Sequence, residues 1–188
     1  MPLLHLLVGP NGSGKSSYVH DLLGPTTGLP FINADEIAAD LWPNARVEHS
    51  YEAARIAEAK RRELISQGTS FISETVFSHP SKLQLVSDAS AAGYLVQLHV
   101  MLVPVDLSVQ RVVERVRRGG HEVPEQKIRD RFERLWVLVR QAIDIADVAE
   151  VCDNSSASSP FRVCATYAHG YQVGTPDWPA WTPEALKL

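Results

Sequence analysis

The chain has 188 residues, 45% of them hydrophobic and 21% charged, a composition that predicts one globular domain of ordinary size. Its formal net charge is −4, which disfavours general nucleic-acid binding. No apolar run reaches the ~18 residues of a membrane span, and the N-terminus lacks a signal-peptide pattern, so we expect a cytoplasmic protein without membrane contact. Cys152 and Cys164 do not have zinc-site spacing and are expected to be reduced core residues.

Apolar runs and helical patterns alternate along the chain. Strands are expected at residues 3–8, 29–33, 69–73, 94–103 and 150–153, and helices at 16–23, 48–67, 80–92, 107–118 and 125–146. This alternation predicts an α/β fold with a five-stranded, mostly parallel sheet and helices on both faces. The nearly continuous apolar run LVQLHVMLVP predicts a central strand that is buried on both sides. Near the C-terminus, FRVCATY and YQV flank AHG and predict a short hairpin.

The stretch GPNGSGKSS, residues 9–17, follows the first expected strand and opens the first expected helix. It fits the pattern G-x-x-x-x-G-K-[ST], in which glycines let backbone amides approach phosphate oxygens at a helix N-terminus. Lys15 is expected to contact the β- and γ-phosphates, and the Ser16 hydroxyl to ligate Mg²⁺. The pattern therefore predicts ATP and Mg²⁺ as ligands. The predicted nucleotide-binding residues are Gly12, Ser13, Gly14, Lys15, Ser16 and Ser17.

A phosphate-binding loop alone does not distinguish an ATPase, a GTPase and a small-molecule kinase. The chain lacks the N-K-x-D pattern with which GTPases read guanine. The fourth expected strand ends in VPVD, whereas a motor ATPase typically shows adjacent acids after such a strand. Both observations favour a kinase.

Two acidic residues stand at the expected ends of the second and third strands. Asp35 follows the second strand in FINADE, and Glu74 follows the third in FISETVFS. Ligands bind beyond the carboxyl ends of strands in an open parallel sheet, so both acids are expected to converge on Lys15. Asp35 is either a general base for an acceptor hydroxyl or the N-cap of a helix over 36–41. Glu74 and Thr75 hold the acceptor or a metal-bound water, or Glu74 is only a solvated acid.

An arginine-rich segment surrounds the glycine pair at 119–120. Such a pair is typical of a hinge, so residues 115–131 are predicted to form a helical lid whose arginines neutralise charge on a transferring phosphoryl group. Helical geometry ranks Arg115 and Arg131 first, because they lie near the apolar faces of their helices. The candidates for phosphate contact are Arg115, Arg118, Arg129 and Arg131. His121 is either a substrate contact or a surface residue of the lid.

Five segments taken together resemble the zeta-toxin-like P-loop kinases, a group that includes UDP-N-acetylglucosamine kinases. They are GPNGSGKSS, FINADEIA, SFISETVFS, GGHEVPEQKIRDRF and VCDNS, and the resemblance spans about residues 1–156. It implies a P-loop NTPase/kinase fold and transfer of the ATP γ-phosphoryl group to a hydroxyl, with UDP-N-acetylglucosamine as the family's acceptor. The chain is shorter than the toxins, and its lid sequence RRGGHEVP is closer to a compact subgroup.

The resemblance also implies roles for individual residues. The matching positions are Lys15 for the phosphate-loop lysine, Asp35 for the catalytic aspartate, Glu74 and Thr75 for the substrate contacts, and Arg115 or Arg118 with Arg131 for the phosphate-binding arginines. No antitoxin segment is visible within the chain, and an antitoxin-like protein partner stays open as a hypothesis that the sequence does not show.

We therefore expect a P-loop kinase domain over residues 1–156, with a C-terminal hairpin and tail at 157–188 packed on it. The expected activity is transfer of the ATP γ-phosphoryl group to a small-molecule acceptor, such as UDP-N-acetylglucosamine or another nucleotide-sugar. Two alternatives stay open. One is a kinase of another small metabolite, and the other is a nucleotide-dependent switch or partner-binding module with weak ATPase activity. The combination of Asp35 with lid arginines favours an enzyme.

Overall fold

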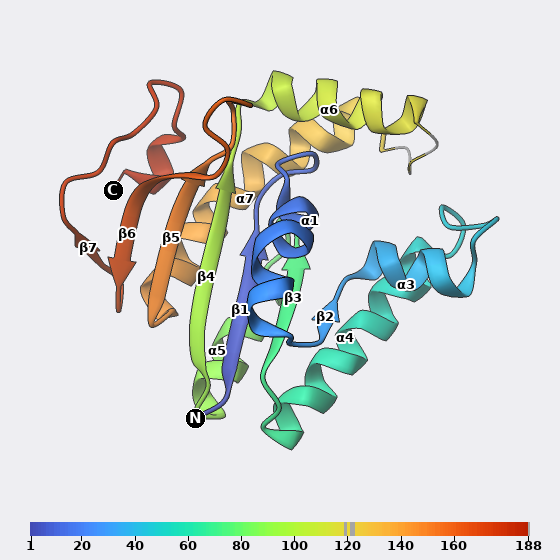
Figure 1. Ribbon diagram of the computed structural model, residues 1–188, viewed down its shortest axis with the longest axis horizontal. Coiled ribbons are helices and arrows are strands. Elements are labelled where there is room, and N and C mark those ends of the chain that lie inside the picture. The colour runs from blue at the N-terminus through green and yellow to red at the C-terminus, as the bar shows by residue number, and fades with distance from the viewer. Residues whose placement is uncertain (119, 121–122, 188) are drawn as a thin grey trace.

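The strands form one sheet that is parallel over most of its width and antiparallel at one edge (Figure 1). The computed structural model describes residues 1–118, 120 and 123–187, and within them the strand order is β2-β3-β1-β4-β5-β6-β7. The strands are β1 (Leu3–Val8), β2 (Phe31–Ile32), β3 (Phe71–Thr75), β4 (Leu95–Leu102), β5 (Val148–Asp153), β6 (Arg162–Ala168) and β7 (Tyr171–Val173). The order places β1, which leads into the phosphate-binding loop, between β3 and β4.

The five predicted parallel strands are confirmed, but the sheet has seven strands within the described part of the chain. The C-terminal hairpin forms as predicted, and its two strands extend the same sheet. β6 pairs antiparallel with the whole of β5, from Val148 opposite Ala168 to Asp153 opposite Arg162. This pairing satisfies backbone groups on an edge of β5 that would otherwise be open.

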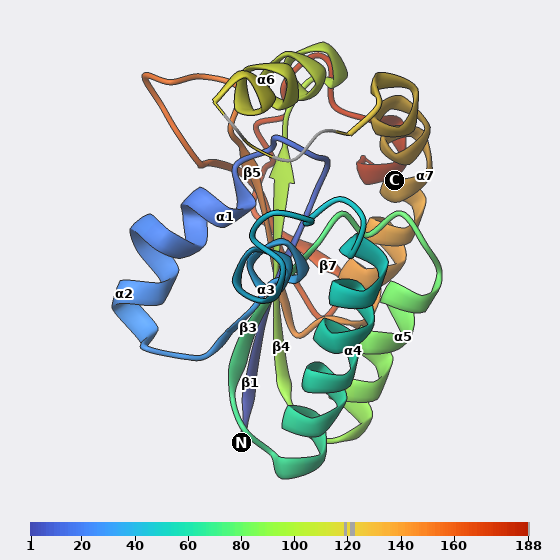
Figure 2. The same cartoon turned by 90° about the vertical axis from the view of Figure 1, so that its right-hand side faces the viewer.

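Helices cover both faces of the sheet, as predicted (Figure 2). One face carries α1 (Lys15–Tyr18), the π-helical segment η1 (Val19–Leu23) and α2 (Gly24–Thr27), and the other carries α4 (Ser50–Gln67), α5 (Ser81–Ala91) and α7 (Glu125–Ile145). The remaining helices are α3 (Ala34–Leu41), which packs against α4, α6 (Val105–Arg117), which packs against α7, and the short turn η2 (Glu184–Leu186). Among the described residues, no helix is both long and apolar enough to cross a membrane.

The first helix and the second strand differ from their predicted bounds. The helix expected over 16–23 continues to Thr27 as three short segments. The strand expected over 29–33 is reduced to two residues, because Asn33 already caps α3. Its side-chain oxygen accepts a 2.7 Å hydrogen bond from the Asp35 amide, as an N-cap residue does. The polypeptide therefore turns into α3 directly after β2.

The third strand begins later than predicted and extends further. Gly68 ends α4 in a left-handed conformation, and the Thr69 amide still bonds to a carbonyl of the last helical turn. Pairing with β1 therefore begins at Phe71 and continues through Glu74 and Thr75. Both residues belong to the strand itself rather than to the loop that follows it.

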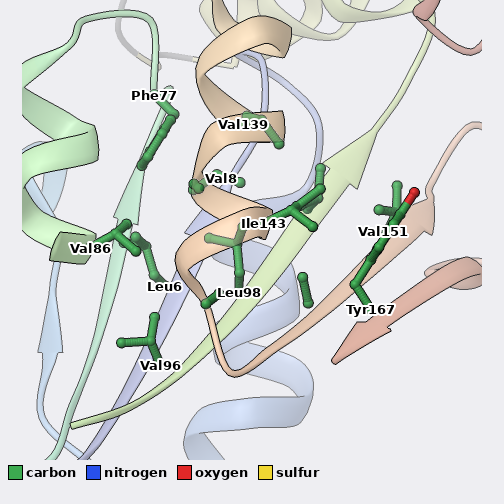
Figure 3. Packing of buried hydrophobic residues seen from close by; sticks show 14 of the residues in the cluster. Leu6, Val8, Phe77, Val86, Val96, Leu98, Val139, Ile143, Val151 and Tyr167 are labelled. Carbon is green, nitrogen blue, oxygen red and sulfur yellow. The ribbon is translucent and has the colours of Figure 1, made fainter. Parts of the chain in front are cut away.

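The hydrophobic core lies mainly between the sheet and the layer of α4, α5 and α7 (Figure 3). Alternate residues of β1 face opposite sides of the sheet, as the pleat requires. Leu4, Leu6 and Val8 belong to the larger cluster, whereas Leu7 packs with Val19 in a smaller cluster beneath α1 and η1. β1 is thus buried on both sides, which gives the phosphate-binding loop a rigid base.

The C-terminal tail packs on α7 and on the edge of the sheet. The Tyr167 hydroxyl donates a 3.1 Å hydrogen bond to the carbonyl of Leu186, and both residues are buried. Trp178 packs against the larger core cluster. In β5 and β6, Cys152 and Cys164 are free and buried, as expected. Burial raises the pKa of the Cys152 thiol to about 12, so this group stays protonated at neutral pH.

Candidate active site

Residues 9–17, called the phosphate loop below, connect β1 to α1 in a form that depends on glycine. Gly9 and Gly14 have φ angles of 146° and 91°, which residues with a side chain rarely adopt. A side chain at Gly9 would also collide with the carbonyl oxygen of Met101, and one at Gly14 with the amide of Asn154. The loop can therefore pack this closely against β4 and against Asn154, the residue after β5, only with glycine at both positions.

Lys15 is buried at the start of α1 although it carries a charge. Its side chain is 5% exposed, and its Nζ donates hydrogen bonds to the carbonyl oxygens of Gly9 and Pro10 at 3.1 and 2.9 Å. The Nζ also lies 4.0 Å from the Glu74 carboxylate. Burial lowers the pKa of Lys15, and the carboxylates of Glu74 and Asp35 oppose that shift. Glu74 of β3 and Asp35 of α3 thus lie close enough to act on this lysine.

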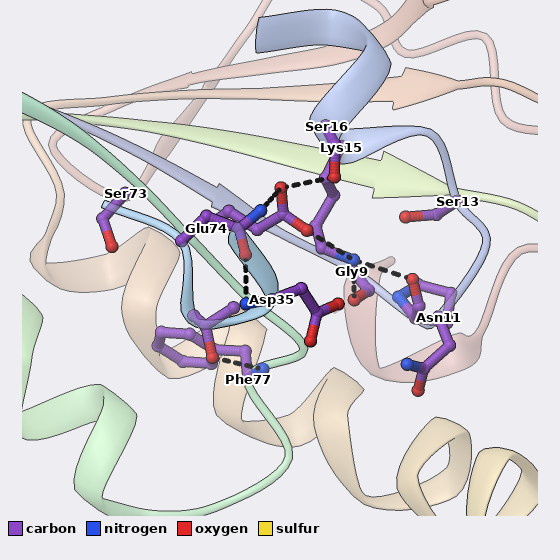
Figure 4. Close-up of polar contacts among 12 residues, drawn as sticks. Gly9, Asn11, Ser13, Lys15, Ser16, Asp35, Ser73, Glu74 and Phe77 are labelled. Carbon is purple, nitrogen blue, oxygen red and sulfur yellow. Dashed lines mark hydrogen bonds and ion pairs between the residues drawn. The ribbon is translucent and has the colours of Figure 1, made fainter. Parts of the chain in front are cut away.

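Glu74 connects the phosphate loop to the start of α3 (Figure 4). Its Oε2 accepts hydrogen bonds from the Ser16 hydroxyl at 2.8 Å and from the Asn33 side-chain amide at 3.1 Å. In the parallel pairing of β3 with β1, Glu74 lies opposite Leu7, just before the phosphate loop. Its side chain is only 14% exposed. The interpretation of Glu74 as a solvated acid is therefore wrong, because this carboxylate is a partly buried acceptor.

Asp35 lies in the first turn of α3 and faces the phosphate loop (Figure 4). The interpretation of Asp35 as the helix N-cap is wrong, because α3 begins at Ala34 and Asn33 is its cap. The Asp35 carboxylate is exposed to the cavity that the phosphate loop borders. Asn33 holds both acids of the site in place, since its amide nitrogen bonds to Glu74 and its oxygen to the Asp35 backbone.

A cavity of about 480 Å³ lies between the phosphate loop, β3, α3 and α6. Most of the predicted site residues line it: Gly12, Gly14, Lys15, Ser16, Ser17, Asp35, Glu74 and Arg115. A cavity of this volume is in the range of sites for nucleotides and drug-sized ligands. The convergence of residues from four segments of the chain identifies it as the candidate active site.

Ser13 and Thr75, which were predicted as site residues, do not line this cavity. Ser13 is a fully buried residue of the phosphate loop, and its backbone carbonyl accepts a 2.9 Å hydrogen bond from the Asn154 side chain. Thr75 ends β3, and its hydroxyl accepts a 3.3 Å hydrogen bond from the amide of Phe77. In this structure the two hydroxyl-bearing residues support the backbone around the site and do not line the cavity.

The predicted lid arginines separate into different environments. Arg131 of α7 is partly buried, and its guanidinium donates a long, 3.5 Å hydrogen bond to the side chain of Asn11 in the phosphate loop. Burial and the charge of Arg134 lower the pKa of Arg131, while the Asp35 carboxylate raises it, so Arg131 lies within electrostatic reach of Asp35. Arg118 is exposed at the end of α6 and does not line the cavity. Arg129 forms surface ion pairs with Asp106 and Glu125. His121 lies outside the described residues.

Sequence reasoning missed several residues that line the cavity: Asn11, Val76, Arg111, Asn154 and Phe161. Asn11 was inside the recognised loop pattern, but it occupies one of its variable positions. Arg111 lies one helical turn before Arg115, so the four-residue spacing could have suggested that both face the same side of α6. Asn154 was visible as a polar residue directly after a buried strand. No sequence signal identified Phe161, because only the fold brings the segment after β5 next to the phosphate loop.

Ser16 and Glu74 are the residues best suited to hold a magnesium ion. A hydroxyl and a carboxylate that are 2.8 Å apart are hard oxygen donors of the kind that Mg²⁺ prefers. In the described part of the chain, no cluster of three or more His, Cys, Asp or Glu could form a metal site. The pair of Ser16 and Glu74 fits Mg²⁺, because this ion binds through few protein ligands and completes its coordination shell with phosphates and water.

The family of the chain follows from a comparison with known protein families. Residues 4–135 match the family described as AAA domain, so the chain belongs to that family. The matched region runs from β1 into α7 and contains the phosphate loop, Asp35 and Glu74. None of the curated proteins compared with the chain matches it.

Solved structures with a similar fold include a chain of a toxin–antitoxin system and a small-molecule kinase. One is a chain of the AvrRxo1-ORF1:-ORF2 complex with ATP, at a TM-score of 0.73 and 17% identity, covering 92% of this chain and 60% of that one. A chain of the PezAT toxin–antitoxin system of Streptococcus pneumoniae has a TM-score of 0.64 at 16% identity, with coverages of 81% and 68%. Shikimate kinase from Acinetobacter baumannii has a TM-score of 0.54 at 18% identity, with coverages of 84% and 87%.

These likenesses show the fold of the chain, which is an α/β P-loop kinase fold. The predicted fold class is thereby confirmed. The chain spans only 60% of the length of the AvrRxo1 protein that it matches.

Proposed function

We propose that the protein is an ATP-dependent phosphotransferase that acts on a hydroxyl of a small molecule. The observation that carries this proposal is the position of Asp35, whose side chain borders two neighbouring cavities. The larger one contains the phosphate loop. The smaller one, of about 170 Å³, lies away from that loop and is lined by Asp35, Ala38, Arg46, Ser50, Arg115 and Gly120. An acid between a nucleotide pocket and a second pocket is arranged for group transfer.

The larger cavity is proposed to bind ATP with Mg²⁺. Lys15 would exchange its bonds to loop carbonyls for bonds to the β- and γ-phosphates, and Ser16 with Glu74 would hold the metal, which neutralises phosphate charge when bound. This assignment agrees with the likeness to a complex solved with ATP. A protein that consumes ATP is expected to work in the cytoplasm.

Asp35 is proposed to orient the acceptor hydroxyl and to accept its proton. The acceptor oxygen forms a bond to the γ-phosphorus, the bond between that phosphorus and the β–γ bridging oxygen breaks, and ADP leaves. Asp35 lies in the first turn of α3, and its carboxylate lines the cavity, so an acceptor hydroxyl bound there can reach it.

Arg115 and Arg131 are proposed to stabilise the transferring phosphoryl group. Arg115 lines both cavities, and Arg131 reaches the phosphate loop from α7. Guanidinium groups that are already in place stabilise charge in the transition state without further reorganisation. Arg118, which is exposed at the end of α6, would join them only if it moves toward a bound ligand.

The acceptor is proposed to carry negative charge as well as a hydroxyl. Arg46 and Arg115 outnumber Asp35 among the charged residues of the smaller cavity. A nucleotide-sugar such as UDP-N-acetylglucosamine, the acceptor implied by the resemblance to zeta-toxin-like kinases, meets this requirement, and so do other anionic metabolites. A separate antitoxin-like protein is a further proposed partner, since two of the similar structures come from such paired systems or complexes.

The experiment is a transfer assay with ATP labelled in the γ-phosphate, Mg²⁺ and either UDP-N-acetylglucosamine or a polar metabolite extract. We expect a labelled product with wild type and with Lys60→Ala, an exposed lysine on α4, but none with Lys15→Ala. Label that appears only as free phosphate, at a rate independent of any acceptor, would instead support a slowly hydrolysing switch. Binding of ATP without any transfer or hydrolysis would contradict the enzyme proposal altogether.

A further inference from the structure

We propose that Phe161 is the platform on which the nucleotide base stacks, an inference that rests on the proposed binding of ATP. The sheet order gives the cavity a direction. Asp35 and Glu74 come from the β2–β3 side of β1, whereas Asn154 and Phe161 come from the segment after β5, on its opposite side. With the triphosphate on the phosphate loop at the end of β1 and its γ end toward Asp35, the base extends toward β5.

The ring of Phe161 lies directly beside the phosphate loop. It meets the ring of Tyr18 in α1 edge to face, with centroids 5.1 Å apart and an interplanar angle of 76°. A Cβ placed on Gly14 would be 3.4 Å from the Phe161 ring. In Figure 2 the segment after β5 extends between α1 and α6, which agrees with the presence of Phe161 and Arg111 in one cavity lining. The ring therefore forms a wall of the cavity on its β5 side.

The backbone of Phe161 has a strained conformation. Its φ is 55°, in the left-handed region that bulky residues rarely adopt. Asn154 stabilises this conformation, because its side-chain oxygen accepts a 3.4 Å hydrogen bond from the Phe161 amide while its nitrogen donates to the Ser13 carbonyl at 2.9 Å. One buried asparagine thus ties Phe161 to the phosphate loop. Residues kept in such strained conformations cluster at ligand-binding sites.

The chemistry of the lining favours a base as the group that contacts Phe161. The described residues of this cavity are mostly polar or charged, and among them Val76 and Phe161 are the ones with apolar side chains. A phosphate group does not stack on an aromatic ring, whereas stacking on such a ring is favourable for every nucleobase. Arg111 lines the same cavity, and its guanidinium donates a 3.4 Å hydrogen bond to the Gly12 carbonyl. A positively charged group therefore lies in the same cavity wall as the Phe161 ring.

The test compares two ligands that share phosphates and differ in the base, ATP and inorganic tripolyphosphate, each with Mg²⁺. Dissociation constants are measured by calorimetry for wild type, Phe161→Leu, which keeps the bulk, and Phe161→Tyr, which keeps the aromatic face. We expect Phe161→Leu to weaken ATP binding by roughly 5- to 150-fold, the range for loss of one stacked base. Tripolyphosphate binding should change by less than about twofold, since stacking does not contribute to it. Phe161→Tyr should bind both ligands like wild type.

Three results would overturn the inference. Unchanged ATP affinity in Phe161→Leu would show that the ring does not contact the base. Equal weakening of ATP and tripolyphosphate would show that Phe161 acts only by supporting the phosphate loop. Loss of ATP affinity in Phe161→Tyr but not in Phe161→Leu would show that space rather than stacking matters. If wild type binds neither ATP nor tripolyphosphate, the proposed function is also wrong. If Phe161→Leu binds ATP like wild type and wild type still transfers phosphate from ATP, only the inference about Phe161 is wrong and the proposed function is unaffected.

Discussion

The Ser16 hydroxyl donates a 2.8 Å hydrogen bond to the Glu74 carboxylate, across the boundary between the phosphate loop and β3. The two residues are 58 positions apart in the chain and meet because β3 and β1 pair in parallel. In P-loop proteins that cleave or transfer phosphate, a loop hydroxyl and an acid from a neighbouring strand hold Mg²⁺ together. We therefore propose that Glu74 contacts the metal rather than the acceptor.

Glu74→Gln tests this assignment. The substitution removes the charge but keeps an oxygen that can accept the hydrogen bond from Ser16, so the local structure should persist. We expect the Mg²⁺ concentration for half-maximal activity to rise by about tenfold, which corresponds to about 1.4 kcal/mol of lost ion binding. Glu63→Gln, an exposed acid on α4, is the control. If Glu74→Gln has an unchanged Mg²⁺ dependence and a higher KM for the acceptor, Glu74 contacts the acceptor and not the metal.

Asp35→Asn tests the general base. Removal of such a group lowers the rate by roughly 10²- to 10⁴-fold, and we expect a fall in kcat of that size. The affinity for ATP should not decrease, because the asparagine places no additional negative charge near the phosphates. Asp40→Asn, in the same helix and exposed, should retain full activity. Wild-type kcat in Asp35→Asn would exclude Asp35 from proton transfer.

Arg131 and Arg134 form a matched pair on α7. Arg131 is partly buried and reaches Asn11, whereas Arg134 is exposed and bonds to a carbonyl of its own helix. We expect Arg131→Ala to lower kcat by roughly 10²- to 10³-fold, as loss of one group that stabilises developing charge does, and Arg134→Ala to have little effect. Arg131→Lys should restore only part of the rate, since an ammonium group cannot reproduce the planar fork. Equal activity in both alanine variants would mean that Arg131 does not contribute to phosphoryl transfer.

A buried histidine pair beneath α1 predicts a pH dependence of stability. The Nδ1 of His5 and the Nε2 of His99 are 3.0 Å apart, and burial, together with the charge of His5, lowers the pKa of His99 to about 3. Between about pH 6.5 and pH 3 the unfolded chain binds a proton at this position and the folded chain does not, so stability falls as pH falls. At pH 5.5 the loss attributable to His99 is on the order of 1 kcal/mol.

Urea unfolding at pH 7.5 and pH 5.5 measures this effect. His99→Gln removes the titrating group and keeps a polar side chain near His5, so its free energy of unfolding should depend less on pH than that of wild type. His169→Gln, an exposed histidine in the turn of the hairpin, should leave the wild-type dependence intact. Identical pH dependences in all three proteins would mean that the pair does not resist protonation.

Much of the site could be predicted from local sequence, because its parts are local. The phosphate loop needs a strand, glycines at set positions, a lysine and a helix start, and all of these lie within residues 3–18. The strand-end positions of Asp35 and Glu74 were also visible, since parallel strands bring their carboxyl ends to one edge of a sheet. The structure agrees with these expectations in placing Lys15, Ser16, Asp35 and Glu74 around one cavity.

Other features depended on the pairing of distant segments and had no local signal. Asn33 looked like a turn residue, but the fold makes it the cap of α3 and the link between both acids. The hairpin was visible in sequence, yet only the unpaired edge of β5 decided that it would extend the sheet. Arg118 and Arg131 belong to the same arginine-rich segment, and burial against the phosphate loop distinguishes one from the other.

The sequence by itself determined the class of fold and the phosphate-binding element, because hydrophobic periodicity and backbone conformational demands act over a few residues. Only the tertiary structure decided which side chains meet across the sheet. It assigned Glu74 to Ser16, placed Asp35 between two cavities and brought Phe161 beside Gly14. Such contacts arise from strand order and packing between segments more than 50 residues apart in the first case and more than 140 in the last, and no local pattern encodes them.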